Sequence, residues 1–246
     1  MTKPLETEVD AISEYYDNYT NRQISINVND RIFGLYQRMI KNGLNSKSNV
    51  LELGCGIGTL SFLISKKVKL GTIEAVDISK RSIAFAKQKI KKSNFFFYAG
   101  NIVGYQAKIK NPEIITLFDV LEHIPIEQHW DLFQNISSQM TSETILLINL
   151  PNPDLIEYEQ LNDPDVLQIV DQAVHHPVMV ENLYAHNLEI QKMEKYGIWL
   201  KDDYIFYTVV KKRPFAMIEL QSQRTFLQKI PVKLFRLKLK WFYRYK

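Results

Sequence analysis

The most constraining feature of the sequence is a short apolar run that ends in three alternating glycines. Residues 50–58 read Val-Leu-Glu-Leu-Gly-Cys-Gly-Ile-Gly. The apolar run predicts a buried strand, and the residues after Gly58 predict a helix. Glycines are needed where a ligand must approach the backbone closely, and the start of a helix offers unpaired N–H groups to that ligand. The stretch therefore predicts a strand–turn–helix unit with a ligand at its turn.

The following part of the chain repeats this alternation. Apolar runs predict strands at residues 49–53, 72–77, 95–98, 113–118 and 144–150. Helical spacing and capping residues predict helices at residues 31–44, 59–67, 79–92 and 126–140. Such alternation implies a mainly parallel sheet with helices on both faces. Strands at 189–200 and 204–212 follow with only a Lys-Asp-Asp turn between them, which predicts an antiparallel final pair.

Two segments depart from the repeating pattern and suggest the domain boundaries. Residues 151–188 interrupt the last strands with a long polar stretch, and a long segment at the C-terminal edge of a sheet is usually functional. We therefore expect an N-terminal lid or lead-in at 1–30 and a main domain at 31–212, with a substrate-covering insertion at 151–188. A basic C-terminal extension at 213–246 completes the chain.

Composition excludes several classes of protein. The 246 residues are 46% apolar and 24% charged, which is typical of globular domains. A single cysteine excludes an internal disulfide, and no histidines and carboxylates share metal-ligand spacing, so we expect no metal site. The N-terminus is acidic, unlike a signal peptide, and no run of 18 apolar residues occurs, so we expect a cytoplasmic protein.

The charge is distributed unevenly along the chain. Residues 211–246 hold 11 Lys/Arg and one acid, a net charge of +10, whereas residues 1–210 hold 20 basic and 26 acidic residues, a net charge of −6. Within 229–246 the cations are interleaved with Trp241, Phe242 and Tyr243. Three hypotheses stay open for this tail: packing on its own acidic domain or on the partner of a homodimer, peripheral contact with an anionic membrane surface, and, least favoured, nucleic-acid binding.

A second carboxylate indicates the class of ligand. Asp77 ends the next strand, 23 residues after Gly54, where it can accept both hydroxyls of a ribose. Dinucleotide-binding turns read G-x-G-x-x-G, but this turn reads G-x-G-x-G and is preceded by Glu52. That carboxylate would repel a pyrophosphate and attract a cation. S-adenosylmethionine carries a sulfonium and an ammonium and no phosphate, so it is the favoured cofactor.

Three segments, in order and at matching spacing, resemble the successive motifs of the class I S-adenosylmethionine-dependent methyltransferases. They are residues 51–58, residues 75–78 (Ala-Val-Asp-Ile) and residues 118–124 (Phe-Asp-Val-Leu-Glu-His-Ile). The resemblance covers residues 30–150 and extends to the closing strands. It implies an α/β, Rossmann-like fold with a seven-stranded, mostly parallel sheet, an antiparallel last strand and helices on both faces.

The resemblance also implies roles for individual residues. The methionine end of the cofactor would contact Glu52, Gly54, Cys55 and Gly56. The nucleoside would contact Asp77 through its ribose and Ile78, Asn101 and Ile102 through its adenine. The floor beneath the sulfonium would consist of Asp119, Val120 and Leu121. Because relatives fold an N-terminal lid across the cofactor, Tyr15 and Tyr19 are further candidate contacts.

The Leu-Glu-His-Ile form of the third motif resembles the branch that methylates small molecules, and we expect O-methylation. A general base helps when the acceptor is a hydroxyl, and His175 and His176 in the insertion are the candidates for that base. The candidate substrate contacts are His123, Tyr16 and Tyr158. Two alternatives stay open: methylation of RNA or protein with the basic tail as the grip, and a non-catalytic partner subunit that binds the cofactor.

Overall fold

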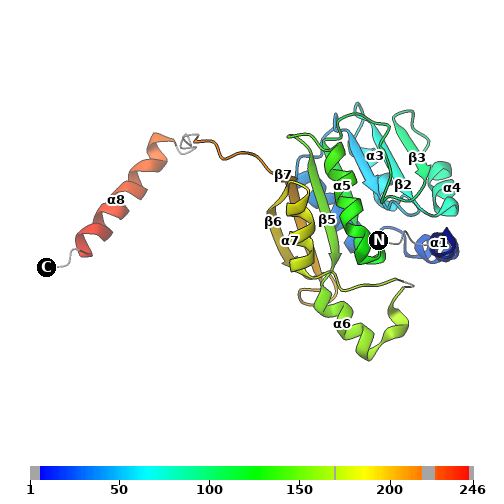
Figure 1. Ribbon diagram of the computed structural model, residues 1–246. Helices are drawn as coiled ribbons and strands as arrows, with labels where there is room; N and C mark the ends of the chain where they lie inside the picture. Colours follow the sequence, from blue (N-terminus) through cyan, green and yellow to red (C-terminus); the bar gives the residue numbers. More distant parts are fainter. Residues whose placement is uncertain (1–5, 169, 218–224, 244–246) are drawn as a thin grey trace. The chain divides into compact units, whose positions relative to one another are not determined.

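The centre of the protein is a seven-stranded sheet with the strand order β3-β2-β1-β4-β5-β7-β6 (Figure 1). The computed structural model describes residues 6–168, 170–217 and 225–243. The strands are β1 (Val50–Leu53), β2 (Ile73–Asp77), β3 (Phe95–Ala99), β4 (Ile114–Phe118), β5 (Ile145–Pro151), β6 (Leu188–Tyr196) and β7 (Tyr204–Lys211). The first five strands pair in parallel, and β7 lies antiparallel between β5 and β6. The expected fold class is confirmed.

The helices form two layers because neighbouring residues of each strand point to opposite faces. On β4, for example, Ile115 and Leu117 belong to one core and Ile114 and Phe118 to the other. The first core packs against α5 (His129–Gln139) and α7 (His176–Ala185). The second core packs against α2 (Asp30–Lys41), α3 (Thr59–Lys67) and α4 (Lys80–Lys89). Strands buried on both faces explain why their sequences are continuously apolar.

Local capping explains where two of the predicted elements end. The predicted helix at 79–92 begins at residue 80, because the Ser79 side chain accepts a hydrogen bond from the Ser82 N–H as an N-cap. It ends at Lys89. The predicted strand at 189–200 ends at Tyr196, since the Asp203 carboxylate accepts the N–H groups of Ile198, Trp199 and Leu200 and holds them in a turn.

The segment expected as one insertion, residues 151–188, contains two different kinds of structure. Its first part carries α6 (Pro153–Asn162) and the short η3 (Pro164–Val166), which lie beyond the carboxyl ends of the strands (Figure 1). Its last part is α7, whose Met179 and Leu183 are fully buried in the first core. Residues 176–185 therefore belong to the helical layer on one face of the sheet.

The N-terminal segment is a helix, α1 (Glu6–Ile26), that packs along α4. Side chains fasten the two helices: the Thr20 and Ser82 hydroxyls lie 3.0 Å apart, and Asp17 accepts the Arg81 N–H at 3.0 Å. The Ser13 hydroxyl also donates to the Ile78 carbonyl at 3.3 Å. These contacts hold α1 at the carboxyl ends of β1 and β2.

The chain divides into two compact units, residues 1–212 and 213–246. The second unit carries α8 (Phe226–Phe242), which begins with a capping box between Thr225 and Gln228. No helix among the described residues is both long and apolar enough to cross a membrane.

Candidate active site

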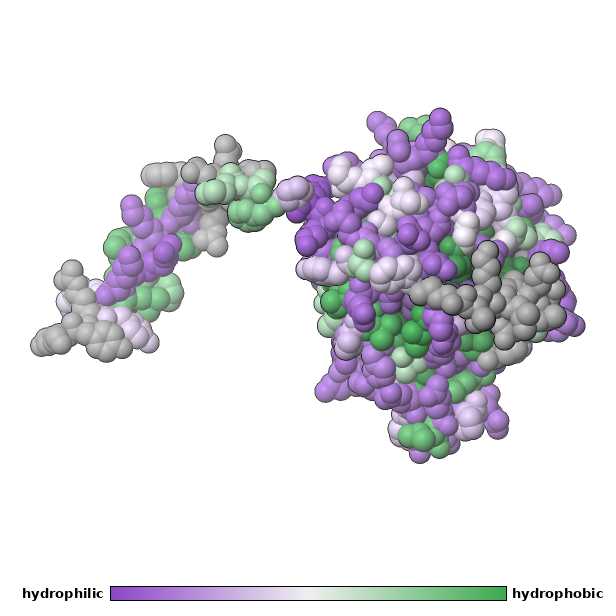
Figure 2. Space-filling view, in the orientation of Figure 1, coloured by the Kyte–Doolittle hydropathy of each residue, from purple (hydrophilic) through white to green (hydrophobic). Residues whose placement is uncertain are grey.

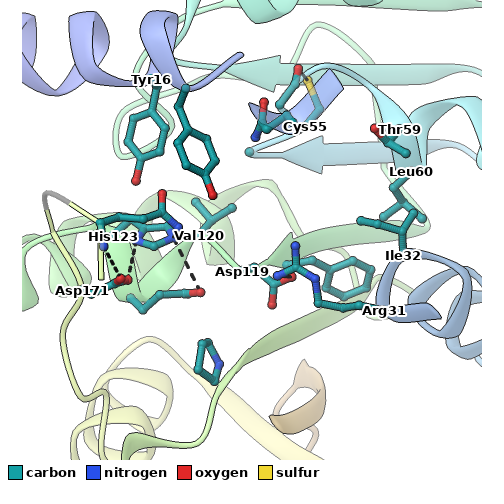
Figure 3. A pocket seen from close by; sticks show the side chains of 18 of the residues that line it. Tyr16, Arg31, Ile32, Cys55, Thr59, Leu60, Asp119, Val120, His123 and Asp171 are labelled. Carbon is teal, nitrogen blue, oxygen red and sulfur yellow. Dashed lines mark hydrogen bonds and ion pairs between the residues drawn. The ribbon is translucent and has the colours of Figure 1, made fainter. Parts of the chain in front are cut away.

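A cavity of about 550 Å³ opens at the carboxyl ends of β1, β2 and β4 (Figure 3). Its walls come from α1, the glycine turn after β1, the residues after β4, α6, η3 and the β6–β7 turn. Ligand sites of open α/β sheets lie at this edge, and cavities for small molecules measure about 300 to 1,000 Å³. The cavity therefore has the place and the size expected of a ligand site.

The glycine turn is held close to the segment after β4. Gly54 has a φ of +80°, a backbone conformation that favours glycine, and a Cβ there would overlap the Val120 side chain. Gly56, with a φ of +52°, faces the other wall, since a Cβ there would meet the Gln23 side chain of α1 at 3.0 Å. The missing side chains leave room for the backbone of the turn to face the cavity.

Two buried carboxyl groups flank the turn. Glu52 on β1 accepts a hydrogen bond from the Ser61 hydroxyl at 2.5 Å, and burial raises the pKa of this carboxyl to about 8. Asp77 at the end of β2 accepts the N–H groups of Gly56 at 2.7 Å and Ser79 at 2.9 Å, one on each oxygen. Burial also raises the pKa of Asp77, while these two hydrogen bonds lower it. Each carboxylate oxygen keeps a lone pair for a ligand.

Asp119 occupies a strained position immediately after β4. Its φ of +54° is unusual for a residue with a side chain and is typical of functional sites. The carboxylate is held on both sides, by the Arg31 guanidinium at 2.7 Å (Figure 3) and by the Asn149 amide at 2.7 Å. The Asp119 charge raises the pKa of Arg31. These contacts join α2, β4 and β5 at the floor of the cavity.

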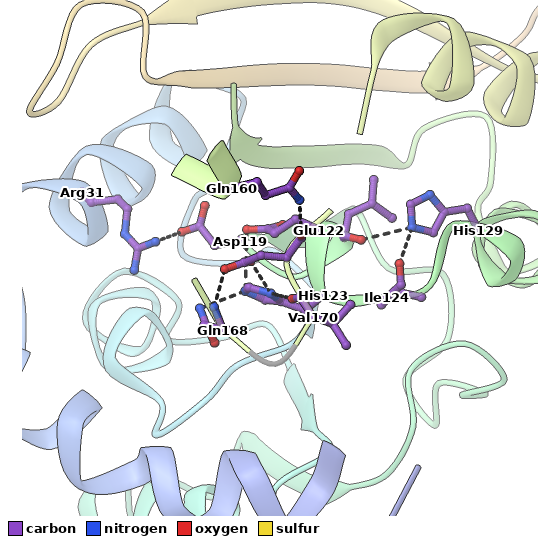
Figure 4. Close-up of polar contacts among 11 residues, drawn as sticks. Arg31, Asp119, Glu122, His123, Ile124, His129, Gln160, Gln168 and Val170 are labelled. Carbon is purple, nitrogen blue, oxygen red and sulfur yellow. Dashed lines mark hydrogen bonds and ion pairs between the residues drawn. The ribbon is translucent and has the colours of Figure 1, made fainter. Parts of the chain in front are cut away.

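His123 forms a dyad with an acid from the segment before α7 (Figures 3 and 4). Its Nδ1 lies 2.9 Å from Asp171 Oδ1 and 2.6 Å from the Val170 carbonyl oxygen, so Nδ1 carries the proton. Its Nε2 lies 3.2 Å from the Gln168 amide nitrogen. Burial lowers the pKa of His123, but Glu122 and Asp171 outweigh that effect and raise the pKa to about 9. A histidine oriented in this way is suited to accept a proton at Nε2.

Several buried polar atoms around the cavity lack a partner in the described part of the chain. They are the Tyr16 hydroxyl, Arg31 Nε, Thr116 Oγ1, Glu122 Oε2 and Gln168 Oε1. A buried polar atom without a hydrogen bond is costly, and native structures contain few of them. Their concentration around one cavity indicates that a polar ligand or ordered water completes their hydrogen bonds.

The cavity is strongly acidic. Among its described lining residues, seven carry carboxyl groups, and the single lysine or arginine is Arg31. Such a site attracts cationic ligands and disfavours a pyrophosphate. Within the described ranges, no group of three or more His, Cys, Asp or Glu residues is arranged to hold a metal ion.

Most residues proposed from the sequence for cofactor or substrate line this cavity. They are Tyr16, Tyr19, Glu52, Gly54, Cys55, Gly56, Asp77, Ile78, Asn101, Ile102, Asp119, Val120 and His123. The Asn101 amide oxygen also accepts the Val103 N–H at 3.0 Å. Tyr15 and Leu121 are absent from the cavity wall, and Leu121 is fully buried in the first core. Tyr158 is 62% exposed on α6 and also lies outside the wall.

His175 and His176, the candidate bases from the sequence, also lie outside the cavity wall. His175 is the N-cap of α7 and is exposed, with Nε2 2.9 Å from Glu157. His176 Nδ1 lies 2.5 Å from the Tyr207 hydroxyl. Both histidines lie at the start of α7, and that helix packs on the sheet and does not extend over its edge.

The sequence reasoning missed a set of lining residues that have no motif of their own. They are Gln23, Arg31, Leu155, Ile156, Gln168, Trp199, Leu200 and Tyr204. The turn held by Asp203 brings Trp199 and Leu200 to the wall, whereas the sequence analysis placed both residues at the end of a strand. Asn149 on β5 was not proposed from the sequence either, and its side-chain amide donates to Asp119.

Comparison with known proteins places this architecture. Residues 44–207 match a protein family described as a methyltransferase domain. The mitochondrial ubiquinone biosynthesis O-methyltransferase of Saccharomyces cerevisiae is 27% identical over 185 residues, which cover 71% of this chain and 54% of that protein. A malonyl-acyl-carrier-protein O-methyltransferase of Priestia megaterium is 33% identical over 87 residues, 35% of this chain and 30% of that protein. The chain thus matches about half, or less, of the length of these relatives.

A solved structure shares the fold. Magnesium protoporphyrin IX methyltransferase from Synechocystis PCC 6803, crystallised with bound SAH, superposes with a TM-score of 0.66 at 14% identity. The match covers 82% of this chain and 99% of that chain.

Proposed function

The chain belongs to the class I S-adenosylmethionine-dependent methyltransferases, and on this basis we propose that it methylates a hydroxyl oxygen of a small-molecule acceptor. The observation that carries the proposal is the His123–Asp171 dyad, which faces the same cavity as the glycine turn. A positioned base is useful for a hydroxyl acceptor, because the proton must leave as the new bond forms.

The residues around the cavity fit S-adenosylmethionine. The acidic wall suits a ligand with a sulfonium and an ammonium, and the glycine turn leaves the space that close approach requires. We assign Glu52, Gly54, Cys55 and Gly56 to its methionine end, Asp77 to its ribose, and Ile78, Asn101 and Ile102 to its adenine. When bound, the cofactor supplies a methyl group that an oxygen lone pair takes as the carbon–sulfur bond breaks and its electron pair stays on sulfur.

In this proposal His123 is the base that the sequence reasoning assigned to His175 or His176. Asp171 fixes a proton on Nδ1, so above the pKa of about 9 the Nε2 lone pair is free to take the acceptor's proton once Gln168 gives way to the acceptor. Asp119, held by Arg31 and Asn149, forms the floor between the glycine turn and His123. α1 contributes Tyr16, Tyr19 and Gln23 to the wall beside the turn.

The wall beyond Asp119 indicates the shape of the acceptor. Apolar side chains from α6, η3 and the β6–β7 turn line it, namely Leu155, Ile156, Val166, Leu167, Trp199 and Leu200. An acceptor with an apolar or aromatic body and a hydroxyl group would bury its body there and present the hydroxyl to His123. The names of the two curated relatives above, both O-methyltransferases, support this choice of atom.

Two measurements test the proposal in sequence. Thermal unfolding with S-adenosylhomocysteine, and with NAD in parallel, tests the cofactor: a ligand at 100 times its dissociation constant stabilises by about 2.7 kcal/mol, or roughly 5 to 10 °C at this chain length. Transfer of labelled methyl groups to a panel of phenols, alcohols, carboxylic acids and amines, with RNA and whole protein as further acceptors, then tests the substrate. A shift with NAD alone, or transfer only to RNA or protein, contradicts the proposal.

A further inference from the structure

The helix α8 cannot bury its apolar side chains within its own unit. Among the described residues of that unit, 213–217 and 225–243, it is the sole helix or strand. Its large apolar side chains are 37 to 78% exposed, and Trp241 and Phe242 at its end are 71% and 66% exposed. Figure 2 shows hydrophobic side chains beside hydrophilic ones on its surface. Exposed apolar surface of this extent marks an interaction site.

Cations occupy one narrow side of α8. Lys229, Lys233, Arg236 and Lys240 follow one another at intervals of four, three and four residues. At 3.6 residues per turn they share an arc of about 60°. Apart from Gln228 and Lys238, the described side chains on the rest of the circumference are apolar.

We propose that α8 docks the protein in the plane of an anionic lipid bilayer, with its apolar side in the acyl boundary and its cationic stripe at the headgroups. Basic helices with aromatic residues on the apolar side bind membrane interfaces in this way. Lys238 lies about 180° from Lys229 around the helix and is the one described cation on the apolar side, where its four-carbon stem adds apolar surface. Trp241 and Tyr243 are residue types that favour the interface.

Two of the other partners that could cover this helix, a second copy of α8 and a protein groove, fit it less well than lipid. No aspartate or glutamate follows Glu219, so two copies of α8 would bring like charges together, whereas an anionic surface complements every charged position. A helix bound in a protein groove inserts a narrow row of apolar side chains at helical spacing. A groove that covered this apolar side would have to enclose most of the circumference.

Co-sedimentation of the full chain with vesicles tests the proposal. We expect binding to phosphatidylcholine vesicles that contain about one third phosphatidylglycerol, and none to pure phosphatidylcholine. Each cation near the surface strengthens binding by a factor of about five, so the double substitution K229Q/K233Q should weaken it about 25-fold. The double substitution W241A/F242A should abolish the binding that survives an increase in ionic strength from about 0.1 to 1 M.

The control K47Q/K80Q removes two exposed lysines of the first unit and should bind like the unsubstituted chain. The thermal midpoint of each variant verifies that the first unit is folded. Failure to bind anionic vesicles, or equal binding by all variants, would overturn the proposal. Sedimentation velocity that shows a dimer dissociated by W241A/F242A would assign the apolar side to a second copy instead. The result does not depend on methyl transfer, so it is independent of the function proposed above.

Discussion

His123 Nδ1 lies 2.9 Å from Asp171 Oδ1. This pair connects the motif at residues 118–124 with the segment before α7, in which the sequence shows no motif. The ring is thereby held with Nε2 toward Gln168 and the cavity. The first prediction follows from this geometry. The substitution His123→Gln should lower kcat by about 10² to 10⁴-fold, the usual contribution of a general base, while affinity for S-adenosylhomocysteine stays within a few-fold. Steady-state kinetics and calorimetry check it.

The matched control is His175→Gln, which alters an exposed histidine outside the cavity wall and should leave kcat unchanged. If the two variants lose activity equally, the dyad has no special role.

The second prediction concerns pH. The pKa of His123 is raised to about 9, and the base works only when Nε2 is unprotonated, so kcat/KM should rise about tenfold per pH unit up to about pH 9 and then level. In Asp171→Asn the neighbouring negative charge is lost, so the midpoint should move to lower pH. Asp171 is a positioning residue, and a purely structural role would leave that midpoint in place. A profile that falls with rising pH would indicate that protonated His123 binds an anionic acceptor.

The third prediction concerns Glu52. Burial raises the pKa of this carboxyl to about 8 in the folded protein, against 4.5 for the ordinary group. Between these values the unfolded chain releases the proton that the folded chain keeps, so stability falls as pH rises from about 4.5 to 8. Glu52→Gln should therefore raise the thermal midpoint of the ligand-free protein at pH 8, by about 2 to 4 °C per kcal/mol recovered.

The same substitution should weaken binding of S-adenosylhomocysteine by about 10- to 100-fold, because a charge-assisted hydrogen bond contributes about 1.5 to 3 kcal/mol. Calorimetry in buffers of different ionisation enthalpy should detect proton release on binding to the unsubstituted protein and none for the variant. The exposed Glu181→Gln serves as control and should change neither quantity.

The fourth prediction tests the glycine turn. Gly54→Ala should lower stability by about 2 to 4 kcal/mol, since it combines left-handed backbone strain with overlap against Val120. Adding Val120→Ala removes the overlap and should recover part of the loss, which a double-mutant cycle of unfolding free energies would measure. Gly104→Ala, with no atoms within 4 Å of its added Cβ, should cost little.

The fifth prediction concerns Tyr16, whose buried hydroxyl has no partner within the described chain. Tyr16→Phe should leave the ligand-free protein equally or more stable, because it removes an unsatisfied group. It should lower the affinity for the ligand that forms a hydrogen bond with this hydroxyl. Titration with S-adenosylhomocysteine and with an identified acceptor shows which of the two ligands forms it. Tyr158→Phe, on an exposed residue outside the cavity wall, should alter neither binding constant.

Much of this site was predictable from short segments of sequence. The strand–turn–helix unit around Gly54 and the carboxylates at Glu52 and Asp77 follow from local pattern, because apolar periodicity, capping and glycine backbone preferences act over a few residues. Those features were sufficient to predict the sheet, the class of cofactor and the family.

The acceptor side required the tertiary structure. Arg31 meets Asp119, and His123 meets Asp171, across loops that sequence spacing leaves unconstrained. Met179 and Leu183 pack into the first core, so α7 lies against the sheet. His175 and His176, at the start of this helix, therefore lie outside the cavity wall. Sequence by itself determined which elements form and which class of cofactor the protein uses. Only the packing of those elements decided which histidine faces the cavity. The burial of a helix face depends on contacts with residues far away in the sequence, and a local motif does not contain that information.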